Sequence, residues 1–191
     1  MELIARMLPL RDARLLELGC GRALTTRRLA ESFPIAELIA TEVDRVQHEK
    51  NLQITDLPGV KFHFGGAEQI DLPDASVDAV IMLKSLHHVP VELMDRGFAE
   101  IARVLRPGGR LMVSDIVLLK ELPDELRQSV SAYVGCVAGA LMKQDYLDTI
   151  QKAGFEDVRV LDETIYPLES LSGDSSGGTI INKLGSVKDN I

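Results

Sequence analysis

Short apolar runs alternate with helical patterns over most of the chain, and this alternation constrains the fold more than any other feature. The runs with the length of strands lie at 13–18, 37–41, 60–64, 77–83 and 110–116. The helical patterns between them lie at 23–32, 45–55 and 91–105. A continuous apolar run is typical of a strand buried on both faces, which requires helices on both sides of the sheet. The sequence therefore predicts an α/β fold with a doubly wound, mostly parallel sheet.

The pattern changes after residue 116. Helical spacing returns at 123–134 and 143–153, and 157–161 has the composition of a sixth strand. From residue 170 the chain is rich in Ser and Gly, which predicts a flexible tail at 170–191.

Charge and cysteine content narrow the classes of partner. The chain has 191 residues and a net charge of −8, and its Lys and Arg residues form no cluster, so we expect no nucleic-acid partner. No apolar stretch reaches the roughly 18–20 residues that cross a bilayer, so we expect no membrane partner either. The two cysteines, Cys20 and Cys136, lie far apart, which favours a reducing, cytoplasmic location. The sequence indicates no oligomeric state.

The segment LLELGCGRA (15–23) connects the first predicted strand to the next helix. Gly19 and Gly21 lack a Cβ, so the backbone can turn tightly and lie against a ligand beyond the carboxyl end of the strand. A dinucleotide loop would have a third glycine where this chain has Leu24. S-adenosylmethionine fits better because its amino-acid end and ribose carry no phosphate. Glu17 is placed to meet its ammonium group.

A second acid follows the second predicted strand, in the segment IATEVD. A carboxylate at this position can accept hydrogen bonds from both hydroxyls of a ribose. Glu42 comes directly after the apolar run and is the preferred candidate. Asp44 is the alternative, and its other role would be to cap the helix that follows.

Together these segments resemble the class I S-adenosylmethionine-dependent methyltransferases, which have a Rossmann-like fold. LLELGCGRA is similar to the first motif of that family. The segments GGAEQIDLPDASVDAVIMLKSLHHV and EIARVLRPGGRLMVSDI are similar to the stretch spanning the third and fourth strands and to the end of the core sheet. The resemblance implies a single methyltransferase domain over 1–191, with a cofactor-binding core at 13–116 and substrate-side helices and the last strand at 117–165.

The resemblance also implies further contacts with S-adenosylmethionine. The backbone near Ala67 and a side chain beside it read the adenine edge in that family. Gly66 stands where an acid or amide is usual, so Glu68 or Gln69 would take this role. The backbone of Lys84 and Ser85 is expected to touch the methionine part of the cofactor.

Cys20 lies inside the glycine loop and is grouped with the cofactor-binding residues, although its side chain is expected to be structural.

The region after the core resembles arsenite methyltransferases over about 118–165, most clearly in YVGCVAGAL. This resemblance implies that Cys136 is an arsenic ligand, since thiolate is the soft ligand that proteins offer. The other cysteines of that family are missing here, so small thiols would have to complete the coordination. The alternative is that Cys136 is a buried small hydrophobe. We also expect the fold to be abbreviated at both ends, because little chain precedes the first strand and the C-terminal part is short.

His87 and Asp115 follow the fourth and fifth predicted strands and are the remaining catalytic candidates. A histidine at this rim can act as a general base for an oxygen or carbon acid, and Asp115 would point toward the substrate. The alternatives are that His87 packs or bonds to backbone and that Asp115 caps a helix. No metal site is predicted, because His87 and His88 have no cysteines or paired acids nearby.

We therefore expect methyl transfer from S-adenosylmethionine to a small acceptor, with trivalent arsenic held by Cys136 as one candidate. One alternative is C- or O-methylation of a small organic metabolite of the quinone or sterol type. The other is a cofactor-binding protein without turnover.

Overall fold

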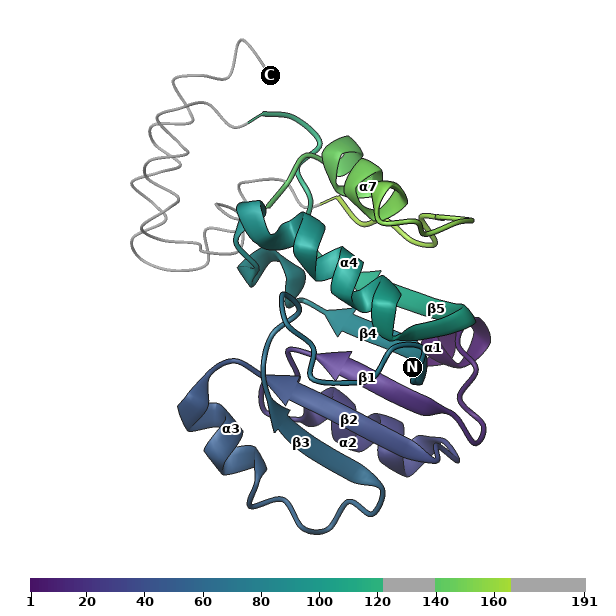
Figure 1. Ribbon diagram of the computed structural model, residues 1–191, viewed down its shortest axis with the longest axis vertical. Helices are drawn as coiled ribbons and strands as arrows, with labels where there is room; N and C mark the ends of the chain where they lie inside the picture. Colours follow the sequence, from purple (N-terminus) through teal and green to yellow (C-terminus); the bar gives the residue numbers. More distant parts are fainter. Residues whose placement is uncertain (122–139, 166–191) are drawn as a thin grey trace.

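The computed structural model describes residues 1–121 and 140–165 (Figure 1). Five parallel strands form one sheet in the order β3-β2-β1-β4-β5. Their bounds are β1 Arg14–Leu18, β2 Glu37–Glu42, β3 Val60–Phe64, β4 Val77–Leu83 and β5 Leu105–Ser114. The chain runs outward from β1 to β3 and then returns to place β4 and β5 on the other side of β1. The prediction of a doubly wound parallel sheet is confirmed, with the topological switch between β1 and β4.

Helices cover both faces of this sheet (Figure 1). Their bounds are α1 Glu2–Met7, α2 Leu24–Ser32, α3 Arg45–Asn51, α4 Met94–Val104 and α7 Lys143–Lys152. Two 3-10 turns, η1 Leu86–His88 and η2 Val91–Leu93, lie between β4 and α4. Within the described ranges, no helix has the length and apolar character needed to cross a bilayer.

Two hydrophobic cores explain why the central strands β1 and β4 are mostly apolar. Alternate side chains of a strand point to opposite faces, so Leu15 of β1 packs in the core on the side of α1 and α2. Its neighbour Leu16 packs in the core on the side of α4 and α7. Phe98 of α4 is fully buried at the centre of this second core, with its ring edge-on to Tyr146 and Phe155. Burial on both faces favours apolar residues in the middle strands, and the buried acids Glu17 and Glu42 are exceptions at their carboxyl ends.

Several predicted bounds differ from the structure. The helix expected at 45–55 ends at Asn51, and β5 begins at Leu105, before the predicted start. The predicted sixth strand at 157–161 is wrong, because these residues form no ladder with any described strand and most are exposed. A short alternating segment becomes a strand only where a partner strand satisfies its backbone. The predicted helix at 123–134 lies outside the described residues, and so does the predicted tail at 170–191.

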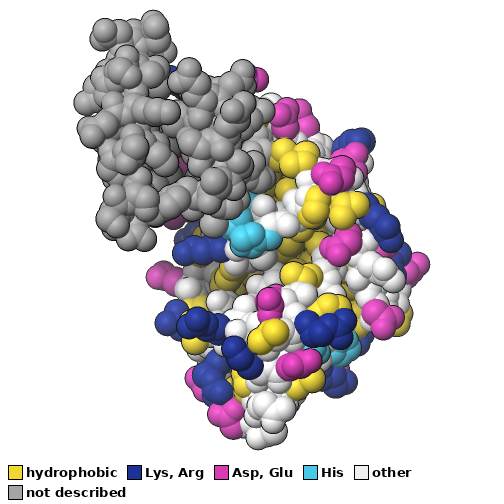
Figure 2. Space-filling model, turned by 90° about the vertical axis from the view of Figure 1, so that its left-hand side faces the viewer, with side chains coloured by type: hydrophobic (Ala, Val, Ile, Leu, Met, Phe, Trp, Pro, Cys, Tyr) yellow, Lys and Arg dark blue, Asp and Glu magenta, His cyan; other side chains and the backbone are white. Residues whose placement is uncertain are grey.

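All five strands end at the same edge of the sheet. Figure 2 faces this edge and shows a histidine side chain beside apolar side chains. The loops that follow β1, β2, β4 and β5 meet here, and they carry most of the predicted site residues. This carboxyl edge is where open parallel sheets bind ligands.

Candidate functional site

The glycine loop after β1 is held against the loop after β4. Gly19 has φ +75°, and a Cβ added to it would lie 2.5 Å from the Cβ of Ser85. The Ser85 hydroxyl donates to the Leu18 carbonyl at 2.9 Å. The backbone N–H groups of Gly19 and Cys20 donate to the Thr41 carbonyl at 3.1 and 2.8 Å. Only glycine fits at position 19, because both the backbone angle and the close approach exclude a side chain.

Asn51, the last residue of α3, braces the same loop, and the sequence analysis missed it. Its side-chain amide donates to the Gly21 carbonyl at 2.8 Å, lies 3.4 Å from the Cys20 sulfur, and is itself held by Gln47. The residue is only 1% exposed. No local pattern distinguishes an asparagine of this kind from an ordinary residue at a helix end, because its partners lie about 30 residues away in the chain.

Glu42, at the end of β2, is fixed by backbone donors. Its Oε2 accepts from the Gly21 N–H at 2.8 Å, and its Oε1 accepts from the N–H groups of Val43 and Asp44 at 2.9 Å each. The side chain is buried at the edge of the glycine loop. Such a carboxylate is rigid and can accept further hydrogen bonds from a ligand's hydroxyl groups.

Asp44 has the alternative role that the sequence offered for it. Its carboxylate accepts from the Gln47 N–H at 2.6 Å and caps the N-terminus of α3. The side chain is therefore engaged by its own helix, and Glu42 is the acid that contacts the glycine loop.

Glu17, inside the end of β1, accepts a hydrogen bond at 2.6 Å from the hydroxyl of Thr26 on α2. Burial raises the pKa of this carboxyl from 4.5 to about 7, an effect that the Thr26 hydroxyl partly opposes. Its predicted contact with the ammonium group of a ligand stays a prediction.

The two buried acids give this edge a negative potential. Across the described residues, neither Glu17 nor Glu42 has a Lys, Arg or His nitrogen within 4.0 Å. Burial, together with the charges of both acids, raises the pKa of the Cys20 thiol to about 12. The thiol is therefore neutral and buried, which agrees with the structural role expected for Cys20 from the sequence. A cationic ligand fits this environment, whereas a pyrophosphate would be repelled.

His87 and Asp115 form a buried pair, which the sequence analysis had treated as two separate candidates. His87 lies in η1 after β4 and Asp115 follows β5, and their Nδ1 and Oδ1 atoms are 2.5 Å apart. The Asp115 carboxylate also accepts from the backbone N–H groups of His87 at 2.9 Å and of Ile116 at 2.8 Å. Nδ1 therefore carries the hydrogen, which leaves Nε2 as the acceptor. Nε2 is buried and has no hydrogen-bond partner in the described part of the chain.

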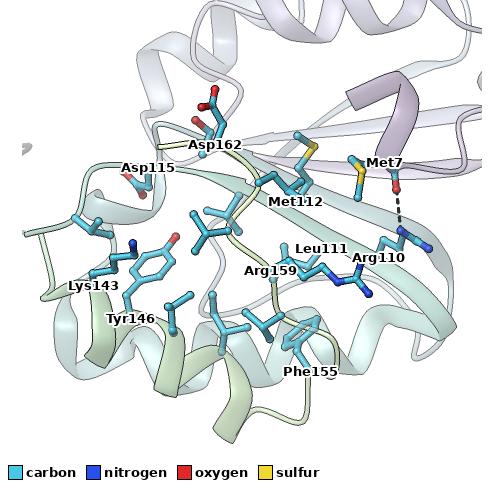
Figure 3. Close-up of a pocket in the computed structure, with 18 of the residues that line it drawn as sticks. Met7, Arg110, Leu111, Met112, Asp115, Lys143, Tyr146, Phe155, Arg159 and Asp162 are labelled. Atoms are coloured by element: carbon cyan, nitrogen blue, oxygen red, sulfur yellow. Dashed lines mark hydrogen bonds between the residues drawn. The ribbon is translucent and has the colours of Figure 1, made fainter. Parts of the chain in front are cut away.

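A hollow of about 2050 Å³ lies beside this pair, along β5 and under α7 (Figure 3). His87, Asp115 and Tyr146 line it together with a mostly apolar wall that includes Leu111, Val113, Ile150, Phe155 and Val158. The Tyr146 hydroxyl is buried and, like His87 Nε2, has no partner among the described residues. Tyr146 was not among the predicted site residues, because in sequence it is only one apolar position of a helix.

Comparison with known proteins decides the family. The profile of a family described as "Methyltransferase domain" matches residues 16–113, just over half of the chain. The chain belongs to this methyltransferase family. Its fold and its relatives identify it as a class I S-adenosylmethionine-dependent methyltransferase that resembles arsenite methyltransferases.

Its relatives include methyltransferases with different acceptors. An O-methyltransferase of Penicillium expansum is 31% identical over 96% of this chain and 68% of its own length. An arsenite methyltransferase of Halobacterium salinarum is 31% identical over 76% of this chain and 38% of its own length. The solved arsenic(III) S-adenosylmethionine methyltransferase of Chlamydomonas reinhardtii is 25% identical, with a TM-score of 0.68. That likeness covers 78% of this chain and 54% of the algal one.

The remaining predicted residues of this methyltransferase lie around the same edge. Ala67 is buried against Gly97 of α4. A Cβ added to Gly66 would lie 2.3 Å from a carboxylate oxygen of Glu68, so the Glu68 side chain fills the space of a side chain at position 66. Lys84 has φ +57°, and its N–H donates to the Ser114 carbonyl at 2.7 Å. The predicted contacts of these residues with the cofactor stay predictions.

The predicted arsenic ligand Cys136 lies outside the described residues. In the described ranges, His, Cys, Asp and Glu side chains form no group of three that could hold a metal ion.

The methyltransferase should become less stable relative to a Glu17→Gln variant as pH rises. Since the folded pKa of Glu17 is about 7 and its ordinary value is 4.5, the folded protein keeps a proton here that the unfolded chain has lost. The free energy of unfolding of the wild type therefore falls as pH rises from 4.5 through 7, and at pH 8 the buried charge costs about 2–3 kcal/mol. Glutamine is neutral at every pH. Urea denaturation should therefore show equal stabilities near pH 4.5 and a more stable variant at pH 8, and parallel pH profiles would contradict the shift.

Proposed function

We propose that this methyltransferase transfers the methyl group of S-adenosylmethionine to a hydroxyl oxygen of a small acceptor, with His87 as the general base. The observation that carries the proposal is the buried His87–Asp115 pair, which lines the hollow beside the carboxyl edge and leaves His87 Nε2 without a partner among the described residues. A base is needed only when the nucleophile has a proton to lose, and a hydroxyl group is such a nucleophile.

The residues around the glycine loop fit the cofactor. Glu42 would accept from the ribose hydroxyls, and the backbone at Gly19 and Gly21 would lie against the amino-acid end. Glu17, whose pKa of about 7 leaves it partly ionised at neutral pH, would add a second negative charge on the same side when a ligand with a sulfonium and an ammonium group binds. When bound, S-adenosylmethionine supplies an electrophilic methyl group with a neutral thioether as leaving group.

The chain's own contribution is to orient the acceptor and to remove its proton. Asp115 fixes the orientation of the imidazole through Nδ1. Nε2 would take the proton of the acceptor's hydroxyl group as that oxygen receives the methyl group that bound S-adenosylmethionine supplies. The Asp115 carboxylate then stabilises the imidazolium. The apolar wall of the hollow excludes water, which would otherwise compete as an acceptor.

Methylation of trivalent arsenic is the second candidate. It is supported by the segment around Cys136 and by the similarity to arsenite methyltransferases. Trivalent arsenic attacks through its own lone pair, so this reaction needs a thiolate ligand and no base. The two candidates therefore depend on different residues: the first fails when His87 is lost, and the second fails when Cys136 is lost.

The test is a transfer assay with isotope-labelled S-adenosylmethionine and two acceptors, 2-naphthol and arsenite with glutathione. We expect label on the oxygen of 2-naphthol and calorimetric binding of S-adenosylhomocysteine that excess NADH does not displace. Label on arsenic that disappears in Cys136→Ser, with none on the naphthol, would replace the first candidate by the second. Binding without transfer to either acceptor would favour a protein that holds the cofactor without turnover.

A further inference from the structure

The second unpartnered polar atom in the hollow, the Tyr146 hydroxyl, identifies the acceptor more closely. We infer that Tyr146 donates a hydrogen bond to a second oxygen of the acceptor, so that the preferred substrates are uncharged apolar ring compounds with two neighbouring oxygens, one of which is methylated. This inference rests on the proposed function, because it takes His87 to bind the oxygen that reacts.

Tyr146 is held in place by its ring. The side chain comes from the first turn of α7 and is 8% exposed, and its ring packs edge-on to Phe98 at a centroid distance of 6.2 Å. A phenylalanine would make the same packing contacts. The hydroxyl is buried without a partner among the described residues, which destabilises the protein unless a ligand supplies that partner.

Tyr146 and the His87–Asp115 pair line the same hollow. In Figure 3 the Tyr146 hydroxyl points to the side of the hollow where Asp115 lies. Burial raises the pKa of Tyr146, and the negative charge of Asp115 raises it further. Asp115 in turn contacts His87.

The two free atoms have complementary hydrogen-bonding roles. Tyr146 stays protonated at neutral pH and is a donor, whereas His87 Nε2 is an acceptor. Together they match a molecule with one hydroxyl group and a nearby oxygen that can accept. A vicinal diol on a ring and a hydroxyl beside a carbonyl both have this arrangement.

The wall of the hollow next to Tyr146 favours an uncharged acceptor. The side chains that pack with Tyr146 there, among them Val113, Ile150 and Phe155, offer no partner for a charge, and two pairs of charged side chains at the border of the hollow bind each other. Lys143 binds Glu163 at 2.6 Å, and Arg159 binds Asp157 at 2.7 Å. The hollow is larger than the roughly 300–1,000 Å³ of common small-molecule sites, so a fused ring system can enter.

The experiment compares 2,3-dihydroxynaphthalene with 2-naphthol, which differ by one oxygen. Calorimetry measures the binding of each to the full chain saturated with S-adenosylhomocysteine. The wild type should bind the dihydroxy compound about tenfold more tightly, and Tyr146→Phe should remove this preference without weakening the binding of 2-naphthol. In the absence of ligand, Tyr146→Phe should melt at a higher temperature than the wild type, because it removes a buried unpaired hydroxyl.

Thr149→Val is the matched control, since it removes a hydroxyl of the same helix that is bonded to the Asp145 carbonyl. It should keep the preference. If the wild type binds both naphthalenes equally, binds neither, or keeps its preference in Tyr146→Phe, the inference is wrong. If S-adenosylhomocysteine itself fails to bind, the proposed function is wrong as well, so the two failures are distinct.

Discussion

His87→Gln should lower kcat for methyl transfer to 2-naphthol by about 10²–10⁴-fold, with little change in the affinity for S-adenosylhomocysteine. Glutamine can still donate to Asp115 and fill most of the imidazole's space, but it cannot take a proton. The loss should therefore appear in the chemical step. Single-turnover transfer of labelled methyl measures that step directly, and calorimetry measures cofactor binding.

His88→Gln is the matched control for this variant. His88 is the neighbouring residue, with its ring centroid 4.1 Å from that of His87, but it is exposed. Its replacement should leave turnover within a few-fold of the wild type. Full turnover in His87→Gln would remove the histidine from the mechanism, whereas equal losses in both variants would indicate a disturbed loop rather than a lost base.

Glu42→Gln should weaken the binding of S-adenosylhomocysteine by about 100- to 1,000-fold. The substitution keeps the size of the side chain but removes the negative charge. Its amide group also meets backbone donors that need an acceptor, since Oε1 and Oε2 together accept from three N–H groups. The glycine loop would then lose its anchor to β2 at Gly21, and the ribose would lose a charged partner. Calorimetric titration gives the dissociation constant.

Asp44→Asn distinguishes the two acids that end the second strand. Asparagine is as good an N-cap as aspartate, so α3 should be preserved and cofactor affinity should change only slightly. If Asp44→Asn weakens binding as much as Glu42→Gln does, the ribose partner is Asp44, and the assignment of Glu42 is wrong. Circular dichroism of both variants checks that the fold is intact.

The fold was predictable because burial on both faces leaves a strong local signal. The run VDAVIML coincides with β4, which is buried over most of its length, and it needs no knowledge of distant residues to be recognised. The segment 157–161 shows where this reasoning fails. Its alternation is too short to establish a strand, and the choice between strand and loop depends on whether a neighbouring strand is available.

The candidate site was predictable only in part. Gly19, Gly21 and Glu42 stand out because a parallel strand ends beside them, so their position at the carboxyl edge follows from the strand itself. Asn51, Thr26 and Tyr146 carry no such signal. Each lies on a helix, where a residue of its type is ordinary. Thr26 and Asn51 acquire a role through Glu17 and Gly21, which they contact only in the fold, and Tyr146 acquires one through a buried hydroxyl without a partner among the described residues.

The sequence by itself determined the parallel sheet, the glycine loop and the acid at the end of β2, because each depends on residues that are close together in the chain. Only the tertiary structure decided that His87 is paired with Asp115, that Asp44 caps its own helix, and that the Tyr146 hydroxyl is buried without a partner among the described residues. The physical reason is that hydrogen bonds act over about 3 Å in space, while His87 and Asp115 are 28 residues apart in sequence. The order of the strands brings such residues together, and that order is a property of the whole fold.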